Sequence, residues 1–173
     1  MKQTDFKELP ITARVAYCVK CLSIYIKTKY PNGKLDFIID MACHIVDGSD
    51  GLDSASYLFS EATPEYLYEF DNFKRLSFDY MTEEQYNFFI TIIPKQEEDP
   101  DLNSIMHNIY DVAMTYCYTS VPKGAKETMS YVMNTIDILK KNKLEIPSVE
   151  PFKKYKFEEC NGWGAIIKKE DFL

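Results

Sequence analysis

The stretch ITARVAYCVKCLSIYIKTKY, residues 11–30, sets the expected fold class of this chain. Its apolar side chains form one stripe at helical spacing: Val15, Cys18, Val19, Leu22 and Ile26. The charged residues Arg14, Lys20 and Lys27 are expected to lie away from that stripe. This period is typical of an amphipathic α-helix that buries one face. Pro31-Asn32-Gly33 should end the helix, because proline cannot continue it and Asn-Gly favours a turn.

The same helical period recurs along most of the chain. The pattern predicts further helices over residues 34–46, 53–60, 63–70, 82–93, 101–119 and 123–141. Two starts are marked by capping residues: Thr63-Pro64 is an N-cap followed by a first-turn proline, and Thr82 to Gln85 is a capping box. No segment alternates at period two for long enough to predict a strand. Residues 1–145 should therefore form an all-α bundle of six or seven helices.

The end of the chain, residues 146–173, has a different character. Its prolines and glycines prevent one continuous helix, yet its aromatic residues are too apolar for a free tail. We expect an extended strap packed on the bundle, in one domain with it. Trp163, between Gly162 and Gly164, is interpreted as the buried anchor of the strap, and an exposed binding hot spot is the alternative.

Composition restricts the class of protein. Hydrophobic residues make up 46% of the 173 residues and aromatic residues 14%, which is enough for one well-packed domain. The apolar runs are too short to span a bilayer, and the N-terminus lacks the apolar region of a secretory signal. We therefore expect a cytoplasmic protein. The odd number of cysteines, five, favours reduced thiols over a disulfide framework.

The charge is unevenly distributed. Residues 1–34 carry a net charge of +5, residues 35–101 a net charge of −13, and residues 102–173 a net charge of +1. One block therefore accounts for the acidity of the whole chain, whose net charge is −7. A field of one sign attracts partners of the opposite sign. It also opposes binding of nucleic acid, although Lys153-Lys154-Tyr155-Lys156 is a basic tract beside aromatic residues.

Three groups of residues contain side chains of the types that bind metal ions. Cys18-Val19-Lys20-Cys21 with Cys43 and His44 has the residue types of a zinc site, but a CxxC inside an amphipathic helix is better interpreted as buried thiols. The loop from Asp47 to Asp53 lacks the ligand spacing of a calcium-binding loop. Asp36, Asp40, His44 and Asp47 share one helical face, which is usually a solvated face. We expect no metal and no cofactor.

An enzyme remains the competing hypothesis. A metal-dependent helical enzyme would use Asp36, Asp40, His44 and Asp47, with His107 and Asp111 as a second pair. The chain contains no GxSxG, P-loop, GxGxxG or HExxH motif, so no catalytic residues are predicted.

The chain resembles the helical immunity proteins of bacterial polymorphic toxin systems. The resemblance rests on the opening helix with Ala13 to Tyr17, on the loop Gly48 to Leu52, and on the closing strap with Phe152, Tyr155, Phe157 and Asn161 to Gly164. It implies an all-α, cytoplasmic, non-enzymatic protein that binds and neutralises a cognate toxin, and it specifies no toxin.

Charge then predicts where such a partner would bind. A toxin that attacks nucleic acid, such as a nuclease, must present a basic cleft, and an acidic surface can fill it. The expected partner is thus a toxin with a basic surface, with neither nucleic acid nor membrane as a ligand. A scaffold domain that binds some other basic protein is a further alternative. The predicted partner-binding residues are Asp47, Asp50, Asp53, Glu61, Glu65, Glu69 and Asp71.

Overall fold

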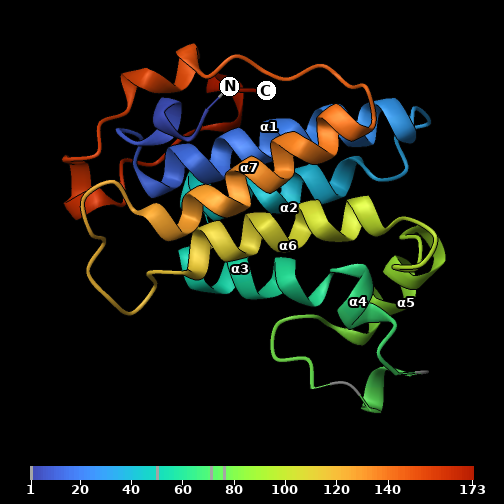
Figure 1. Cartoon of the computed structure of the whole chain (residues 1–173). Helices are drawn as coiled ribbons and strands as arrows, with labels where there is room; N and C mark the ends of the chain where they lie inside the picture. The colour runs from blue at the N-terminus through green and yellow to red at the C-terminus, as the bar shows by residue number, and fades with distance from the viewer. Residues whose placement is uncertain (1, 50, 71, 76) are drawn as a thin grey trace.

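A computed structural model describes residues 2–49, 51–70, 72–75 and 77–173. Within these ranges the chain forms seven α-helices and no strand, which confirms the predicted all-α bundle (Figure 1). The helices are α1 (Ile11–Lys29), α2 (Asp36–Asp47), α3 (Leu52–Glu61), α4 (Pro64–Leu67), α5 (Glu83–Ile92), α6 (Pro100–Met114) and α7 (Lys126–Lys141). None of them combines the length and the apolar character that a bilayer crossing requires.

Helices α1 and α6 form the centre of the bundle. Helix α1 packs on α2, α6 and α7, while α6 packs on α1, α3 and α7, so α3 and α7 lie on opposite sides of the central pair (Figure 1). The expected stripe of α1 is fully buried, as are Leu102, Ile105, Met106 and Ile109 of α6. Helix α3 therefore closes one outer side of the molecule, and its exposed face is available to a partner.

Local sequence signals explain several helix boundaries. Helix α5 begins at the predicted capping box: the Gln85 amide donates to Thr82 Oγ1 at 3.2 Å, and the Thr82 amide donates to Gln85 Oε1 at 2.9 Å. Thr63 precedes α4 as expected, but its hydroxyl donates to the Ser60 carbonyl instead of capping the helix. Gly48 and Gly51 both have positive φ, as the turn between α2 and α3 requires.

The helices predicted over residues 101–119 and 123–141 are both too long where the first ends and the second begins. Helix α6 ends at Met114, five residues early, because the chain turns through 3-10-type hydrogen bonds up to Thr119 and the Thr115 hydroxyl binds the Asp111 carbonyl. Helix α7 begins at Lys126 instead of residue 123, because Gly124 and Ala125 both have positive φ. Helix α4 likewise ends at Leu67 and does not reach residue 70.

The prediction for Arg14 is wrong. Its side chain is completely buried, and its guanidinium donates to main-chain carbonyls of the segments before α1 and before α7. Nε binds the Leu9 carbonyl at 3.0 Å, while the two terminal nitrogens bind the carbonyls of Gly124 at 2.9 Å and Ala125 at 2.6 Å. Burial lowers the pKa of the guanidinium to about 10. Arg14 thus ties the N-terminal segment to the turn before α7, which a pattern of apolar spacing cannot reveal.

A buried carboxylate fixes the other end of α1. Asp99 caps α6 by accepting from the Leu102 amide at 2.9 Å. The same side chain accepts from the hydroxyls of Tyr25 and Tyr30, each at 2.6 Å. Both tyrosines come from the end of α1, so one acid fixes the angle between the two central helices.

The C-terminal strap packs on the bundle as a series of short 3-10 turns, Glu150–Lys154, Glu159–Gly162 and Lys169–Asp171, which replace the expected extended path. Phe152, Ile167 and Phe172 are buried. The Thr12 amide donates to the Trp163 carbonyl at 2.9 Å, and the Ile167 amide donates to the Val46 carbonyl at 2.9 Å. The strap is therefore an integral part of the fold.

Candidate partner-binding surface

Four tyrosines from different parts of the chain gather on the outer side of α3. The Tyr57 ring stacks on the Tyr80 ring at 5.3 Å and lies 6.4 Å from the Tyr110 ring. Tyr118 follows α6, is 78% exposed, and lies close enough to Tyr57 for the Tyr57 hydroxyl to raise the pKa of its phenol. We call Tyr57, Tyr80, Tyr110 and Tyr118, together with the carboxylates Asp53, Glu65 and Glu69, the tyrosine face.

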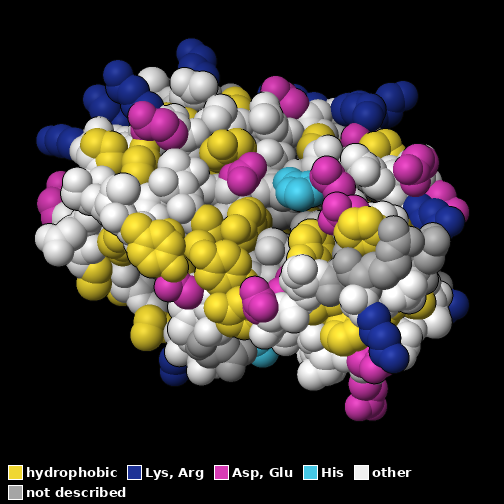
Figure 2. Space-filling model, turned by 90° about the horizontal axis from the view of Figure 1, so that it is seen from below, with side chains coloured by type: hydrophobic (Ala, Val, Ile, Leu, Met, Phe, Trp, Pro, Cys, Tyr) yellow, Lys and Arg dark blue, Asp and Glu magenta, His cyan; other side chains and the backbone are white. Residues whose placement is uncertain are grey.

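Carboxylates surround these rings. Asp53 accepts from the Cys117 thiol at 3.0 Å and from the Tyr118 hydroxyl at 3.4 Å, and Glu65 and Glu69 are exposed. Among the side chains that the structure describes, no Lys or Arg forms an ion pair with these three acids. Figure 2 shows this side of the molecule: apolar and tyrosine side chains gather near its middle beside Asp and Glu, while Lys and Arg lie toward the rim.

A hollow of 430 Å³ lies at the end of the tyrosine face. It is lined by Ser60, Thr63, Glu65, Tyr66, Glu69, His107 and Tyr110, and we call it the Glu65 hollow. His107 Nε2 lies 2.9 Å from a Glu65 carboxylate oxygen, and both side chains line the hollow. Tyr110 belongs both to the hollow and to the ring cluster, so the two are continuous.

The electrostatic field over this surface is negative. Burial raises the pKa of the Tyr66 hydroxyl, and the carboxylates of Glu61, Glu69 and Asp79 raise it further. The neighbouring Tyr57 hydroxyl and the Asp53 carboxylate raise the pKa of Tyr118. Carboxylates favour the neutral phenol in each case. The surface therefore presents neutral rings between negative charges, which suits a positively charged ligand.

Six of the seven predicted partner-binding residues divide into three groups, and Glu61 stands apart from them. Asp53, Glu65 and Glu69 belong to the tyrosine face. Asp47 is half-buried at the end of α2, where it accepts from the amide and hydroxyl of Ser49. Asp50 and Asp71 lie outside the described residues.

Glu61 has an internal role and is a correction to the predicted set. It is 6% exposed, and its carboxylate accepts from the amides of Asp79 at 2.9 Å, Tyr80 at 3.2 Å and Met81 at 2.7 Å. These bonds replace the water that a buried carboxylate loses. Glu61 therefore cannot contact a partner directly, but it fixes the loop that presents Tyr80 to Tyr57.

The residues considered for a metal-dependent enzyme do not converge. Asp36, Asp40 and His44 are exposed on α2, where Asp40 pairs with Lys169 of the strap. His107 and Asp111 lie on α6, beside the tyrosine face. Across the described part of the chain, no group of three or more His, Cys, Asp or Glu side chains has the arrangement of a metal site.

The CxxC residues Cys18 and Cys21 are buried in α1, and all five thiols are free. Burial raises the pKa of Cys18 to about 12 and the pKa of Cys43 to about 11. Cys18 and Cys21 therefore pack as small apolar groups of the core, as their place in an amphipathic helix predicts.

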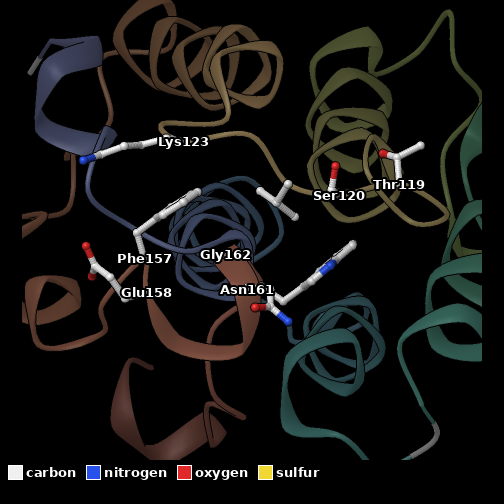
Figure 3. A pocket seen from close by; sticks show the side chains of 9 residues that line it. Thr119, Ser120, Lys123, Phe157, Glu158, Asn161 and Gly162 are labelled. Atoms are coloured by element: carbon white, nitrogen blue, oxygen red, sulfur yellow. The ribbon is translucent and has the colours of Figure 1, made fainter.

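Trp163 is neither a fully buried anchor of the strap nor a fully exposed binding residue. Its side chain is half-buried, packs against the core and lines a hollow of 780 Å³. Figure 3 shows this hollow between Thr119 and Ser120 on one side and Phe157 and Glu158 on the other. Gly162 and Gly164 have φ of +91° and +90°. A Cβ on Gly164 would lie 2.6 Å from Pro10 Cβ, so the strap can approach α1 only with glycine there.

The sequence did not single out the four tyrosines. Tyr57, Tyr80, Tyr110 and Tyr118 are up to 61 positions apart, and no local spacing relates them. The one available signal was the number of tyrosines, 13 in 173 residues. Comparison of the chain with protein-family models, with curated proteins and with solved structures finds no match.

Proposed function

We propose that this protein is an immunity protein that binds a cognate toxin through the tyrosine face. The observation that carries the proposal is a cluster of partly exposed tyrosines bordered by carboxylates that no described Lys or Arg neutralises. Tyrosine is enriched at protein interfaces, and single-sign charge speeds association with a partner of opposite charge. The resemblance to helical immunity proteins supports a toxin as that partner.

The mechanism is steric and electrostatic. Carboxylates of the tyrosine face would occupy the basic cleft in which a toxin such as a nuclease binds phosphate, while the tyrosine rings supply apolar contact area. A bound immunity protein then blocks substrate access without altering the toxin covalently.

Co-expression tests this proposal. The product of the gene immediately upstream should arrest growth when it is expressed alone, and co-expression of this chain should restore growth. The triple variant Asp53→Lys, Glu65→Lys, Glu69→Lys should lose protection and associate with the purified toxin at least about tenfold more slowly at low salt.

A charge-matched control isolates the surface from the net charge. The variant Glu97→Lys, Glu145→Lys, Glu170→Lys changes three exposed carboxylates elsewhere and likewise raises the net charge from −7 by six units, to −1. It should protect like the wild type. Growth arrest without rescue would refute the toxin-binding function, and equal loss in both variants would refute the tyrosine face as its site. Capture of a basic partner that is harmless when expressed alone would favour the scaffold alternative.

A further inference from the structure

Three of the four hydroxyls that line the Glu65 hollow, those of Ser60, Thr63 and Tyr66, already donate to main-chain carbonyls. Ser60 Oγ donates to the Tyr57 carbonyl at 2.9 Å, and Thr63 Oγ1 donates to the Ser60 carbonyl at 2.7 Å. Tyr66 Oη donates to the Ser77 carbonyl at 2.7 Å. The protons of these three hydroxyls therefore point toward main-chain carbonyls, and their oxygens can offer only lone pairs to a ligand.

The remaining groups of the hollow also favour a cation. Glu65 and Glu69 supply two carboxylates, and their exposure leaves oxygens free to accept further hydrogen bonds. Tyr66 and Tyr110 contribute aromatic rings, whose faces attract cations. A volume of 430 Å³ lies within the range of sites that hold a ligand group. A hollow with two carboxylates, acceptor oxygens and rings, in which His107 Nε2 already faces Glu65, is unfavourable for phosphate and carboxylate ligands.

We propose that the Glu65 hollow is a specific seat for one arginine side chain of the protein partner. This inference rests on the proposed function, since it names the group that the toxin would insert. Guanidinium has five N–H donors and no acceptor, and its flat faces stack on aromatic rings. It can therefore bind both carboxylates and lie against Tyr66 or Tyr110 at once. A lysine ammonium has three donors and no flat face, so it would satisfy fewer of these groups.

The position of the hollow makes it suitable as an anchor. Tyr110 links it to Tyr57 and, through Tyr57, to Tyr80 and Tyr118, so an arginine in the hollow would lie beside a continuous surface of rings. Arginine and tyrosine are the residue types that contribute most to binding when they meet near the centre of an interface.

Titration of the isotope-labelled protein with short peptides tests the proposal without the toxin. The probes are acetyl-Gly-Arg-Gly-amide, its lysine counterpart, and the citrulline counterpart, which keeps the shape of arginine but has no charge. Backbone amide shifts should move for residues that line the Glu65 hollow, in a saturable way. The arginine peptide should bind about tenfold more tightly than the citrulline peptide and more tightly than the lysine peptide.

Two variants and a control assign the site. Glu65→Gln with Glu69→Gln should weaken binding of the arginine peptide about tenfold or more, and Tyr110→Leu should abolish its preference over the lysine peptide. Glu97→Gln removes an exposed carboxylate outside the hollow and should change nothing. Circular dichroism of each variant confirms that the helices persist.

The outcomes separate this inference from the proposed function. Equal binding of the arginine and citrulline peptides, or shifts located away from the Glu65 hollow, would overturn the arginine seat even if growth rescue succeeds. Specific arginine binding combined with no rescue would uphold the seat and refute the immunity function.

Discussion

Replacing Arg14 by methionine should destabilise the protein strongly although the apolar volume is nearly preserved. In the folded chain the guanidinium satisfies the carbonyls of Leu9, Gly124 and Ala125. Ala125 would keep one partner, because the Thr128 hydroxyl also donates to its carbonyl at 3.0 Å. The carbonyls of Leu9 and Gly124 would lose the only side-chain donor that the structure describes for them.

The magnitude follows from these two orphaned carbonyls. Each buried, unsatisfied polar group costs about 1–3 kcal/mol, which gives about 2–6 kcal/mol for the pair. Removing the guanidinium also removes its own desolvation cost, which offsets part of that loss. We therefore expect Arg14→Met to lower the free energy of unfolding by about 2–4 kcal/mol, a large share of the roughly 5–15 kcal/mol typical of a domain.

Urea unfolding followed by helical circular dichroism measures this loss. Lys27→Met is the matched control, since it removes a positive charge from the exposed side of the same helix and should change stability by about 0.5 kcal/mol or less. Arg14→Lys should fall between the wild type and Arg14→Met, because an ammonium can serve only some of these carbonyls. An Arg14→Met variant that is as stable as Lys27→Met would show that the buried hydrogen bonds contribute no net stability.

Two further predictions concern the strap and the thiols. Gly164→Ala should lower the free energy of unfolding in urea by about 2–4 kcal/mol, since its Cβ would overlap with Pro10 in addition to the cost of positive φ. Gly51→Ala, where φ is +76° and the surrounding space is open, should lower it by only about 1–2 kcal/mol. Equal losses would contradict the close approach of the strap to α1. In the folded protein at about pH 8, iodoacetamide should modify the exposed Cys160 far faster than Cys18 and Cys43. Burial raises the pKa of Cys18 and Cys43 and leaves almost no thiolate at these two residues. Peptide mass mapping that finds Cys18 labelled first would contradict the buried packing of α1.

Local patterns were sufficient for the parts of the fold that depend on local forces. The apolar period located α1, and the capping box of Thr82 and Gln85 located the start of α5, because both signals lie within a few residues of the structure they specify. The junction of α6 and α7 was misplaced. Its turn is fixed by Gly124 and Ala125 binding Arg14, a contact across 110 and 111 positions of sequence.

The candidate site was predictable only in its charge. The acidic block led to the prediction of Asp53, Glu65 and Glu69, but the sequence could not separate these accessible acids from the buried Glu61. Glu61 differs from them because main-chain amides of the loop from Asp79 to Met81 bind its carboxylate, a contact that the sequence does not reveal. The rings of Tyr57, Tyr80 and Tyr110 meet through tertiary packing, for which no spacing rule exists.

The strap brings the end of the chain near its beginning: the Phe6 ring contacts Tyr17, Tyr17 contacts Phe152, and Phe152 contacts Phe172, at centroid distances of 4.8, 5.4 and 6.3 Å. Figure 1 shows both ends on the side of α1 that faces away from α3, whereas the tyrosine face lies on the side viewed in Figure 2. A tether attached at either end would therefore orient the molecule on a sensor chip with the tyrosine face toward the solution. The same proximity makes the chain a candidate for circular permutation, in which a short linker joins the ends and new ends are opened in an exposed loop.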